Sequence, residues 1–263
     1  MMPILDWRYC SWEAMSQHGQ SSGDLWVCHL GLVPYSDGAA LQETLRERRI
    51  AGEIPDTLLV LEHPPTYTYG RRSGAEDLPL PESFYAAKGV EVHATDRGGK
   101  VTYHGPGQLV GYPIMATSDV LAYLRTMEDA IVDALAQVGV RARSRHAEGI
   151  DYTGVWVEDR KIASIGVHVS RSITTHGFAV NVANDLEPFS WVIACGLPDV
   201  RMTSLAVEAG AECESLRCFR RRMAHSFARA HGRRQRLVSP ARLGIDTTNA
   251  SSQKAVSREP VPA

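Results

Sequence analysis

The 263-residue chain has few cysteines. It contains five, an odd number, and no two of them form a Cys-x-x-Cys pair. A disulfide framework and a cysteine-based zinc knuckle are therefore excluded. The longest aliphatic run is residues 58–61, far short of the roughly 20 apolar residues that span a bilayer. Asp6 and Arg8 interrupt the N-terminus before a signal-peptide core forms, so we expect no membrane segment and a cytoplasmic location.

An excess of charge of one sign is also missing. The 28 basic and 30 acidic residues leave a formal net charge of −2, and only 7% of the residues are aromatic. This balance gives no general footprint for nucleic acid or for an anionic membrane. Hydrophobic residues make up 44% of the chain, enough to bury a substantial core in one large domain or two small ones.

Strand and helix patterns interleave along the chain. Short apolar or alternating segments predict strands at residues 57–62, 90–95, 154–157, 161–169 and 177–182. Apolar spacing of three to four predicts helices from Asp37 to about residue 50, from Ser118 or Asp119 to Gly139, and from Ala211 to Ala230. We expect one α/β or α+β domain, preceded by a leader (1–24) and followed by a disordered tail (237–263) with little to bury.

The segment from Arg97 to Tyr112 combines five glycines with Arg, Thr, Tyr, His and Gln. Glycines let a ligand approach the backbone and permit positive φ, and a plain turn has little use for the polar set. Neither GxxxxGK[ST] nor GxGxxG occurs here, so the pattern of a phosphate-binding loop is missing. Composition favours a ligand loop over a structural turn and leaves the ligand open.

The same segment closely resembles the signature of the octanoyl-(acyl-carrier-protein):protein N-octanoyltransferases, the lipoyl(octanoyl) transferases of lipoate biosynthesis. Further matching motifs follow in order along the chain from about Leu25 to Phe227. They are Leu58–Tyr69 with Gly70-Arg71-Arg72, Arg160–Val169, His176–Val182, Cys195-Gly196 and Thr203-Ser204-Leu205. Several separated, unusual motifs in the correct order make this resemblance specific.

The resemblance implies a single catalytic domain at residues 25–236 of the biotin/lipoate protein ligase–transferase type, with a mixed β-sheet and flanking helices. It implies transfer of an octanoyl or lipoyl group to a protein lysine through a Cys thioester, the first step of endogenous protein lipoylation. The implied donor is octanoyl acyl carrier protein. The implied acceptors are the lipoyl domains of 2-oxoacid dehydrogenases and the glycine cleavage H protein. No cofactor, metal, nucleic acid or membrane is implied.

The resemblance also implies a catalytic pair, which falls on Cys195 and Lys161. The implied acyl-pocket residues are Arg97, Gly98, Gly99, Lys100, Val101, Thr102, Tyr103, His104, Ser164, Ile165, Gly166, Gly177, Phe178 and Ala179. Ala194, Thr175 and Phe178 depart from the residue types frequent in the family. These departures affect the shape of the pocket and leave the pair intact.

The residue types of the pair suit acyl transfer. A free cysteine has a pKa near ~8.5, and a nearby ammonium favours the nucleophilic thiolate. We expect Lys161 to stabilise the Cys195 thiolate and then to accept a proton from the incoming amine. We also expect the backbone N–H of Gly196 to face the oxyanion. Without the resemblance, an isolated Cys195 is typical of a buried structural cysteine and an isolated Lys161 of a solvated lysine.

Two other features have both a structural and a functional interpretation. We interpret His104 as orienting the pocket, and His168 and His176 as structural residues instead of metal ligands. Eight arginines and no acidic residue lie between Arg217 and Arg236. They are a solvated basic helix end or, alternatively, a docking patch for an acidic carrier protein.

Other functional classes compete with the transferase. An ATP-dependent lipoate–protein ligase of the same fold needs no thiolate, so a Cys–Lys pair favours the transferase. The sequence has no recognisable Cys–His–Asn arrangement, which argues against a cysteine hydrolase. A non-catalytic carrier-binding protein would not need the Cys–Lys pair.

Overall fold

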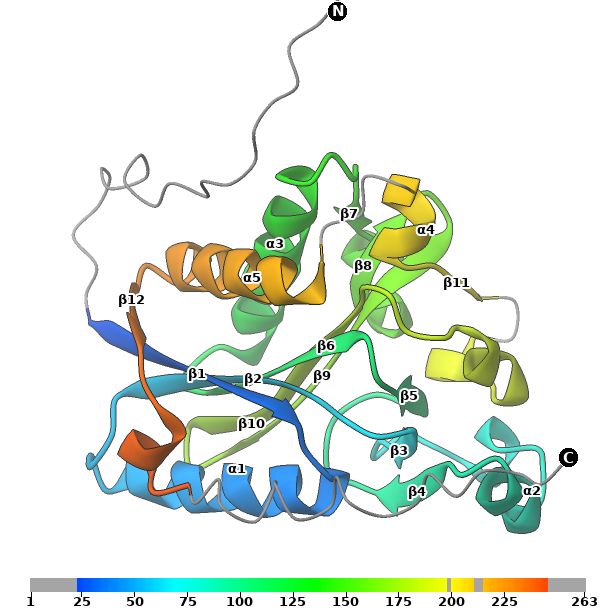
Figure 1. The fold of residues 1–263 in the computed structure, drawn as a ribbon, viewed down its shortest axis with the longest axis horizontal. Helices are drawn as coiled ribbons and strands as arrows, with labels where there is room; N and C mark the ends of the chain where they lie inside the picture. The colour runs from blue at the N-terminus through cyan, green and yellow to red at the C-terminus, as the bar shows by residue number, and fades with distance from the viewer. Residues whose placement is uncertain (1–22, 198–199, 211–214, 246–263) are drawn as a thin grey trace, which may run out of the picture.

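The computed structural model describes residues 23–197, 200–210 and 215–245. Within these ranges the centre is a nine-stranded mixed sheet with helices on both faces (Figure 1). The strand order is β12 (Arg234–Leu237), β1 (Asp24–Leu32), β2 (Asp56–Glu62), β6 (Gln108–Ile114), β10 (Ile173–Asn181), β9 (Arg160–Ser170), β8 (Gly154–Val157) and β7 (Arg143–Ser144). The ninth strand, β11 (Arg201–Met202), pairs in parallel with β9. The expected mixed sheet with flanking helices is confirmed.

Strands β2, β6 and β10 are buried along almost their whole length, and this burial on both faces explains the continuous apolar run Leu58–Leu61 of β2. Along β2, Leu58 and Val60 face the core under α3 (Val120–Ala136) and α5 (Leu216–Ala230). Leu59 and Leu61 point to the opposite core, under α1 (Tyr35–Ile50). Figure 1 shows α1 on one side of the sheet and α3 with α5 on the other.

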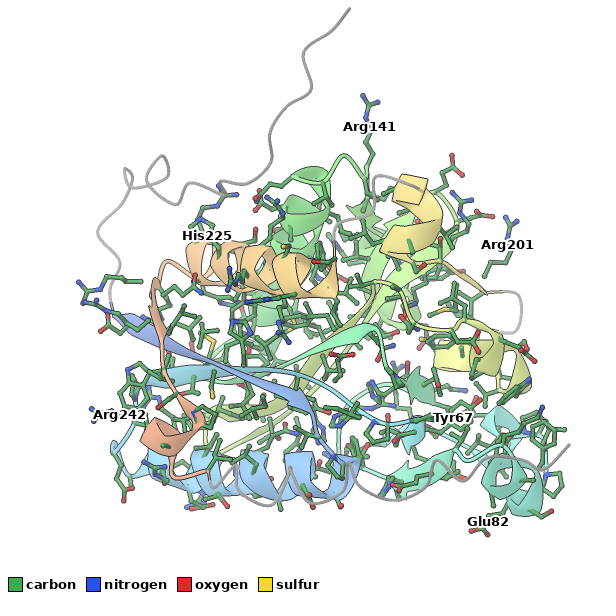
Figure 2. The ribbon with its side chains drawn as sticks, in the orientation of Figure 1. Tyr67, Glu82, Arg141, Arg201, His225 and Arg242 are labelled. Carbon is green, nitrogen blue, oxygen red and sulfur yellow. The ribbon has the colours of Figure 1, made fainter. Side chains whose placement is uncertain are left out.

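A second, three-stranded sheet lies at one end of the molecule. Its order is β4 (Glu91–Ala94), β3 (Thr66–Tyr69), β5 (Thr102–His104), and α2 (Glu82–Ala87) packs beside it. A third core forms here around Tyr67, which is fully buried, whereas Glu82 lies at the edge of the molecule (Figure 2). This core also holds residues of η5 (Glu187–Trp191) and η6 (Ala194–Gly196), so it anchors the segment that carries Cys195.

Helix boundaries follow the capping chemistry. Helix α3 begins after Asp119, whose carboxylate accepts the Ala122 N–H at 3.0 Å, as the sequence predicts. Helix α1 begins at Tyr35, two residues before the expected Asp37 cap, because Pro34 precedes its first turn. Helix α5 begins at Leu216 instead of Ala211, with the Ser215 side chain as its N-cap, and residues 211–214 lie outside the described ranges. A tight hairpin, in which Val157 pairs with Arg160, joins β8 to β9.

The C-terminal boundary differs from the expectation. Leu237 ends β12, which pairs in parallel with β1, and η8 (Pro240–Leu243) follows it. Leu243 is buried in the core under α1, and its carbonyl accepts a hydrogen bond from Arg48 at 2.7 Å. Residues 237–245 therefore pack on the domain. The rest of the expected tail (246–263) and the leader up to residue 22 lie outside the described residues.

Other short elements surround these sheets. They are η2 (Ala75–Asp77), η3 (His146–Glu148), η4 (Ile150–Tyr152) and α4 (Leu205–Ala209). None of the helices in the described ranges has the length and hydrophobicity needed to cross a bilayer.

Candidate active site

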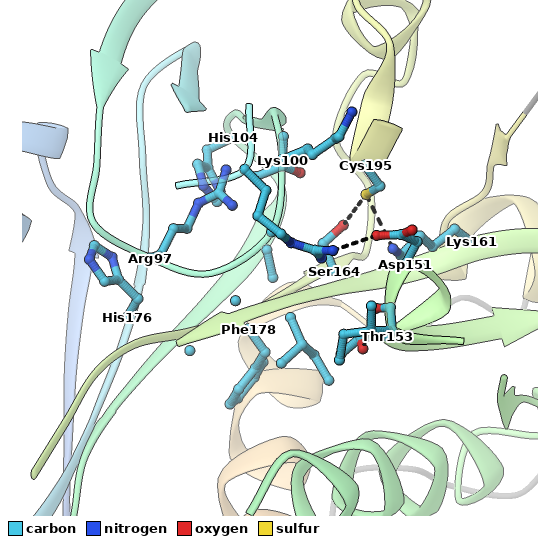
Figure 3. Close-up of a pocket in the computed structure, with 18 of the residues that line it drawn as sticks. Arg97, Lys100, His104, Asp151, Thr153, Lys161, Ser164, His176, Phe178 and Cys195 are labelled. Atoms are coloured by element: carbon cyan, nitrogen blue, oxygen red, sulfur yellow. Dashed lines mark hydrogen bonds and ion pairs between the residues drawn. The ribbon is translucent and has the colours of Figure 1, made fainter. Parts of the chain in front are cut away.

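Cys195 and Lys161 are in direct contact. Lys161 is the second residue of β9, Cys195 lies in η6, and Lys161 Nζ is 3.2 Å from Cys195 Sγ. Ser164, further along β9, places its hydroxyl 3.8 Å from the same sulfur. Figure 3 shows the three side chains converging at one end of a cavity. The fold thus joins two residues that are 34 positions apart in the chain.

Lys161 is buried in a site built around its side chain. It is 2% exposed, and its Nζ lies 5.2 Å from the centre of the Trp156 ring. A Cβ at Gly154 would lie 2.7 Å from Lys161 Cε, so only glycine leaves room there. No carboxylate pairs with Lys161 in the described part of the chain. Its Nζ instead contacts the Cys195 sulfur and the face of the Trp156 ring.

The backbone at Cys195 is strained and firmly held. Cys195 has φ 58° and ψ 11°, a left-handed conformation that costs a non-glycine residue about 1–2 kcal/mol. Its N–H donates to Val101 O at 2.9 Å, and the N–H of Ile193 donates to Asp77 O at 3.0 Å. The Gly196 N–H donates to Ile193 O at 3.2 Å. The expectation that this N–H is available to an oxyanion is wrong, because the tight turn of η6 directs it back to Ile193.

The glycine-rich segment contributes alternate residues to the cavity. Thr102 and His104 of β5 line it, whereas Val101 and Tyr103 point into the third core. This is the two-residue alternation of a strand. Gly98 does not line the cavity either, since its N–H fastens the loop to Val167 O of β9 at 2.9 Å. Gly98, Val101 and Tyr103 are therefore not among the residues that line the cavity, whereas Arg97, Gly99 and Lys100 are.

Arg97 brings a buried positive charge to the cavity. It is 8% exposed, and its guanidinium donates to the carbonyl and hydroxyl of Thr68 and to Gly98 O. Burial lowers the pKa of Arg97. None of the ion pairs seen among the described residues involves Arg97. The cavity thus holds an arginine that forms no ion pair with a carboxylate of residues 23–197, 200–210 or 215–245.

Burial keeps His104 neutral, and a chain of hydrogen bonds orients its ring. The Gln108 amide donates to Tyr103 O and Asn181 Oδ1, so Gln108 Oε1 accepts from His104 Nδ1 at 2.8 Å. Burial lowers the pKa of His104 well below its usual value. The geometry assigns His104 to holding the polar wall of the cavity, with Nε2 facing the Thr68 hydroxyl.

The floor of the cavity is the β9–β10 pair. Ser164, Ile165 and Gly166 of β9 are opposite Ala179, Phe178 and Gly177 of β10, and all six line the cavity. The two glycines permit close backbone approach. A Cβ at Gly166 would lie 2.6 Å from Gly98 O, and one at Gly177 would lie 2.2 Å from Gly111 O.

The cavity also has lining residues that motif reasoning missed. They are Tyr35, Arg72, Tyr112, Ile150, Asp151, Thr153 and His176. Arg72 belongs to the matching Gly70-Arg71-Arg72 motif, which is the one signal that could have identified it. His168 and His176, which we interpret as structural residues, both lie beside Asp96. The Asp96 carboxylate is 2.7 Å from His176 Nε2 and 3.5 Å from His168 Nε2.

Two buried hydroxyls in the cavity have no hydrogen-bond partner within the described residues. They belong to Tyr35, 4% exposed, and Thr102, 6% exposed. A buried hydroxyl without a partner is costly, and a bound ligand is one way to satisfy it.

The arginines between 217 and 236 contact neighbouring elements. Arg229 pairs with Asp133 of α3, Arg233 with Asp56 of β2, and Arg234 and Arg236 with Asp24 of β1. Arg222 donates to Gln137. These contacts favour a structural interpretation for this part of the basic segment.

Comparison with known proteins places the chain in a class. The family described as the lipoyl protein ligase A/B catalytic domain matches residues 34–228, and the chain belongs to this family. Two solved structures share its fold. They are lipoate-protein ligase A bound with ATP (TM-score 0.66, 18% identity, covering 87% of this chain and 91% of the other) and a bi-partite lipoate protein ligase from Thermoplasma acidophilum (0.63, 17%, covering 89% and 90%).

Sequence relatives define the branch within the family. The octanoyltransferase of Acidobacterium capsulatum is 42% identical over 224 residues, 79% of this chain and 88% of the relative. That of Rubrobacter xylanophilus is 48% identical over 186 residues, 69% and 82%. The resemblance to octanoyltransferases and the acyltransferase class, both expected from the motifs, are confirmed.

Proposed function

We propose that this protein transfers an octanoyl or lipoyl group from acyl carrier protein to a lysine of a lipoyl domain, through a thioester on Cys195. The contact between Lys161 Nζ and Cys195 Sγ carries the proposal, because it places a cation against a thiol inside an acyltransferase cavity. Acceptors of this kind are the lipoyl domains of 2-oxoacid dehydrogenases and the glycine cleavage H protein. A cytoplasmic location and the absence of a cofactor belong to the same proposal.

The first half-reaction forms the acyl-enzyme. The Cys195 thiolate attacks the carbonyl carbon of the donor thioester, and the bond from that carbon to the carrier sulfur breaks. The carrier thiolate takes a proton from the Lys161 ammonium and leaves as a thiol. Cys195 now carries the acyl group and Lys161 is neutral.

The second half-reaction forms the amide. Neutral Lys161 takes a proton from the ammonium of the acceptor lysine, and the resulting amine attacks the acyl-enzyme thioester. The carbon–sulfur bond to Cys195 breaks, a proton leaves the new amide nitrogen for solvent, and the thiolate–ammonium pair returns. A thioester is exchanged for an amide, so no ATP is consumed.

An oxyanion develops in both halves, and the backbone N–H groups of Cys195 and Gly196 are already engaged. The buried Thr102 hydroxyl is unpartnered, lines the same cavity, and follows the residue whose carbonyl holds the Cys195 N–H. We assign oxyanion stabilisation to this hydroxyl together with the Lys161 ammonium.

The length of the cavity fits the acyl group. From Ser164, beside Cys195, the lining follows β9 and β10 to His176, whose register partner is Val167. This is three strand positions, about 10 Å. An extended eight-carbon chain has a similar length, which supports octanoyl as the group transferred.

Intact mass measurement tests the function. The protein is incubated with octanoyl carrier protein without ATP, and we expect an octanoyl adduct that hydroxylamine removes and that Cys195→Ala lacks. Lys161→Met should fold and lose the adduct. Transfer to a lipoyl domain that survives in Cys195→Ala, or that requires ATP, would reject the transferase and support the ligase.

A further inference from the structure

The cavity has an uneven charge distribution. Four of its lining side chains are cationic, namely Arg72, Arg97, Lys100 and Lys161. One is a carboxylate, that of Asp151 in η4. Cys195 and this carboxylate line the same cavity, and Figure 3 shows Asp151 near Lys161 and Ser164.

Asp151 is paired at the entrance, not in the interior. Its carboxylate lies 2.7 Å from Arg72 Nη1, and the two side chains are 51% and 45% exposed. Arg72 follows β3, whereas Asp151 precedes β8, so the pair joins two separate walls of the cavity. An ion pair this exposed is weak and exchanges its partner readily.

The positive charge of the proposed acceptor lysine is repelled by the cationic lining of this cavity. A free lysine is an ammonium at neutral pH. Because Lys161 is neutral in the acyl-enzyme, the cationic side chains that disfavour this approach are Arg72, Arg97 and Lys100, the last of which is paired with Asp77 at 3.4 Å. Lys161, the group that must take its proton, is itself buried and lines the cavity. The approaching ammonium therefore needs a carboxylate on its path.

We propose that Asp151 is the acceptor-binding residue. In the second half-reaction its carboxylate exchanges Arg72 for the ammonium of the incoming lysine and holds it until neutral Lys161 removes the proton. This inference rests on the proposed function and adds the residue that selects a cationic acceptor. No bond is made or broken at Asp151, and its charge is the same before and after the step.

The test separates the two half-reactions. Acyl-enzyme of the wild type and of Asp151→Asn is isolated, and each is mixed with a lysine-bearing lipoyl domain or with hydroxylamine, which is uncharged at neutral pH. We expect Asp151→Asn to raise the KM for the lipoyl domain about fivefold, the effect of losing one exposed charge contact. Its rate with hydroxylamine should match that of the wild type.

Arg72→Gln is the matched control, because it breaks the same ion pair and leaves the carboxylate in place. We expect it to lower the KM for the lipoyl domain, since Asp151 no longer has a competing partner. If Arg72→Gln raises the KM as much as Asp151→Asn does, the pair has a structural role and the proposal is wrong. Equal changes with lysine and hydroxylamine, or no change with either, also overturn it. Failure of the wild type to form an acyl-enzyme would instead reject the proposed function.

Discussion

The Lys161 side chain fills the space that a side chain at Gly154 would need: a Cβ on Gly154 would lie 2.7 Å from Lys161 Cε and 2.5 Å from Ala163 O. The two residues lie on neighbouring strands. Because Gly154 has no side chain, the Lys161 side chain can pass beside it and reach Cys195. The position of the buried ammonium is therefore set by a glycine that makes no hydrogen bond to it.

Substitution of Gly154 should remove activity. We expect Gly154→Ala to displace Lys161 and to slow acyl-enzyme formation about 100-fold, because a misplaced catalytic group costs about that much. Gly139→Ala is the control: Gly139 also has positive φ, but nothing lies within 4 Å of its Cβ position. Both variants should lose stability from backbone strain, and only Gly154→Ala should lose the rate. Equal rates in the two variants would contradict the steric account.

Thr102 offers a test of the oxyanion assignment. Because its buried hydroxyl has no partner among the described residues, Thr102→Val should unfold at an equal or higher denaturant concentration. The same variant should form acyl-enzyme about 100-fold more slowly, the cost of losing one oxyanion donor. Thr102→Ser retains the hydroxyl and should recover most of the rate. A Thr102→Val enzyme with the wild-type rate would remove this residue from the mechanism.

The left-handed backbone of Cys195 predicts an unusual order of stabilities. Cys195→Gly should be about 1 kcal/mol more stable than Cys195→Ala, because glycine adopts φ 58° without strain. In the exposed interior of α1, Ala40→Gly should have the opposite effect, a loss of about 1 kcal/mol. Urea unfolding of the four proteins measures both differences. If Cys195→Gly were less stable than Cys195→Ala, the left-handed backbone at this position would not lower the free energy of unfolding, and the prediction would be wrong.

Histidine burial predicts acid sensitivity. His63 is fully buried and lies 2.7 Å from both Val33 O and the Tyr112 hydroxyl, and burial lowers its pKa to about 4. An unfolded histidine has a pKa of about 6.5, so between these values the unfolded state binds the extra proton. Stability should therefore fall with decreasing pH from 6.5 to 4, with a contribution of about 1.4 kcal/mol per pH unit from His63.

The measurement compares His63→Gln with the wild type by chemical denaturation across this range. The variant should be less stable at pH 7, because its hydrogen bonds are altered, but its stability should vary less steeply with pH. Burial also lowers the pKa values of His29 and His231 to about 4, so part of the slope should persist in the variant. An unchanged slope would show that folding does not lower the pKa of His63.

Local patterns were sufficient for most elements. Strand β2 carries a continuous apolar run, and α3 begins after an aspartate cap and ends three residues before Gly139; both signals are readable from neighbouring residues. The division of β5 into cavity and core residues also follows from strand alternation. Treating residues 97–104 as one pocket motif missed it. The end of the domain was misplaced because residues 237–245 were grouped with the polar residues that follow them, yet five of these nine residues are apolar and the segment packs on β1 and the core under α1.

Residue types and motif order, together with the family resemblance, were enough to name Cys195 and Lys161. Their 3.2 Å contact, the engaged N–H of Gly196 and the Arg72–Asp151 pair came from the folded chain. The physical reason is the range of the interactions. Helix caps and strand alternation depend on residues a few positions apart, whereas the cavity forms where β9, β10, β5 and η6 meet. No local pattern specifies which side chains meet there, or which N–H is already used.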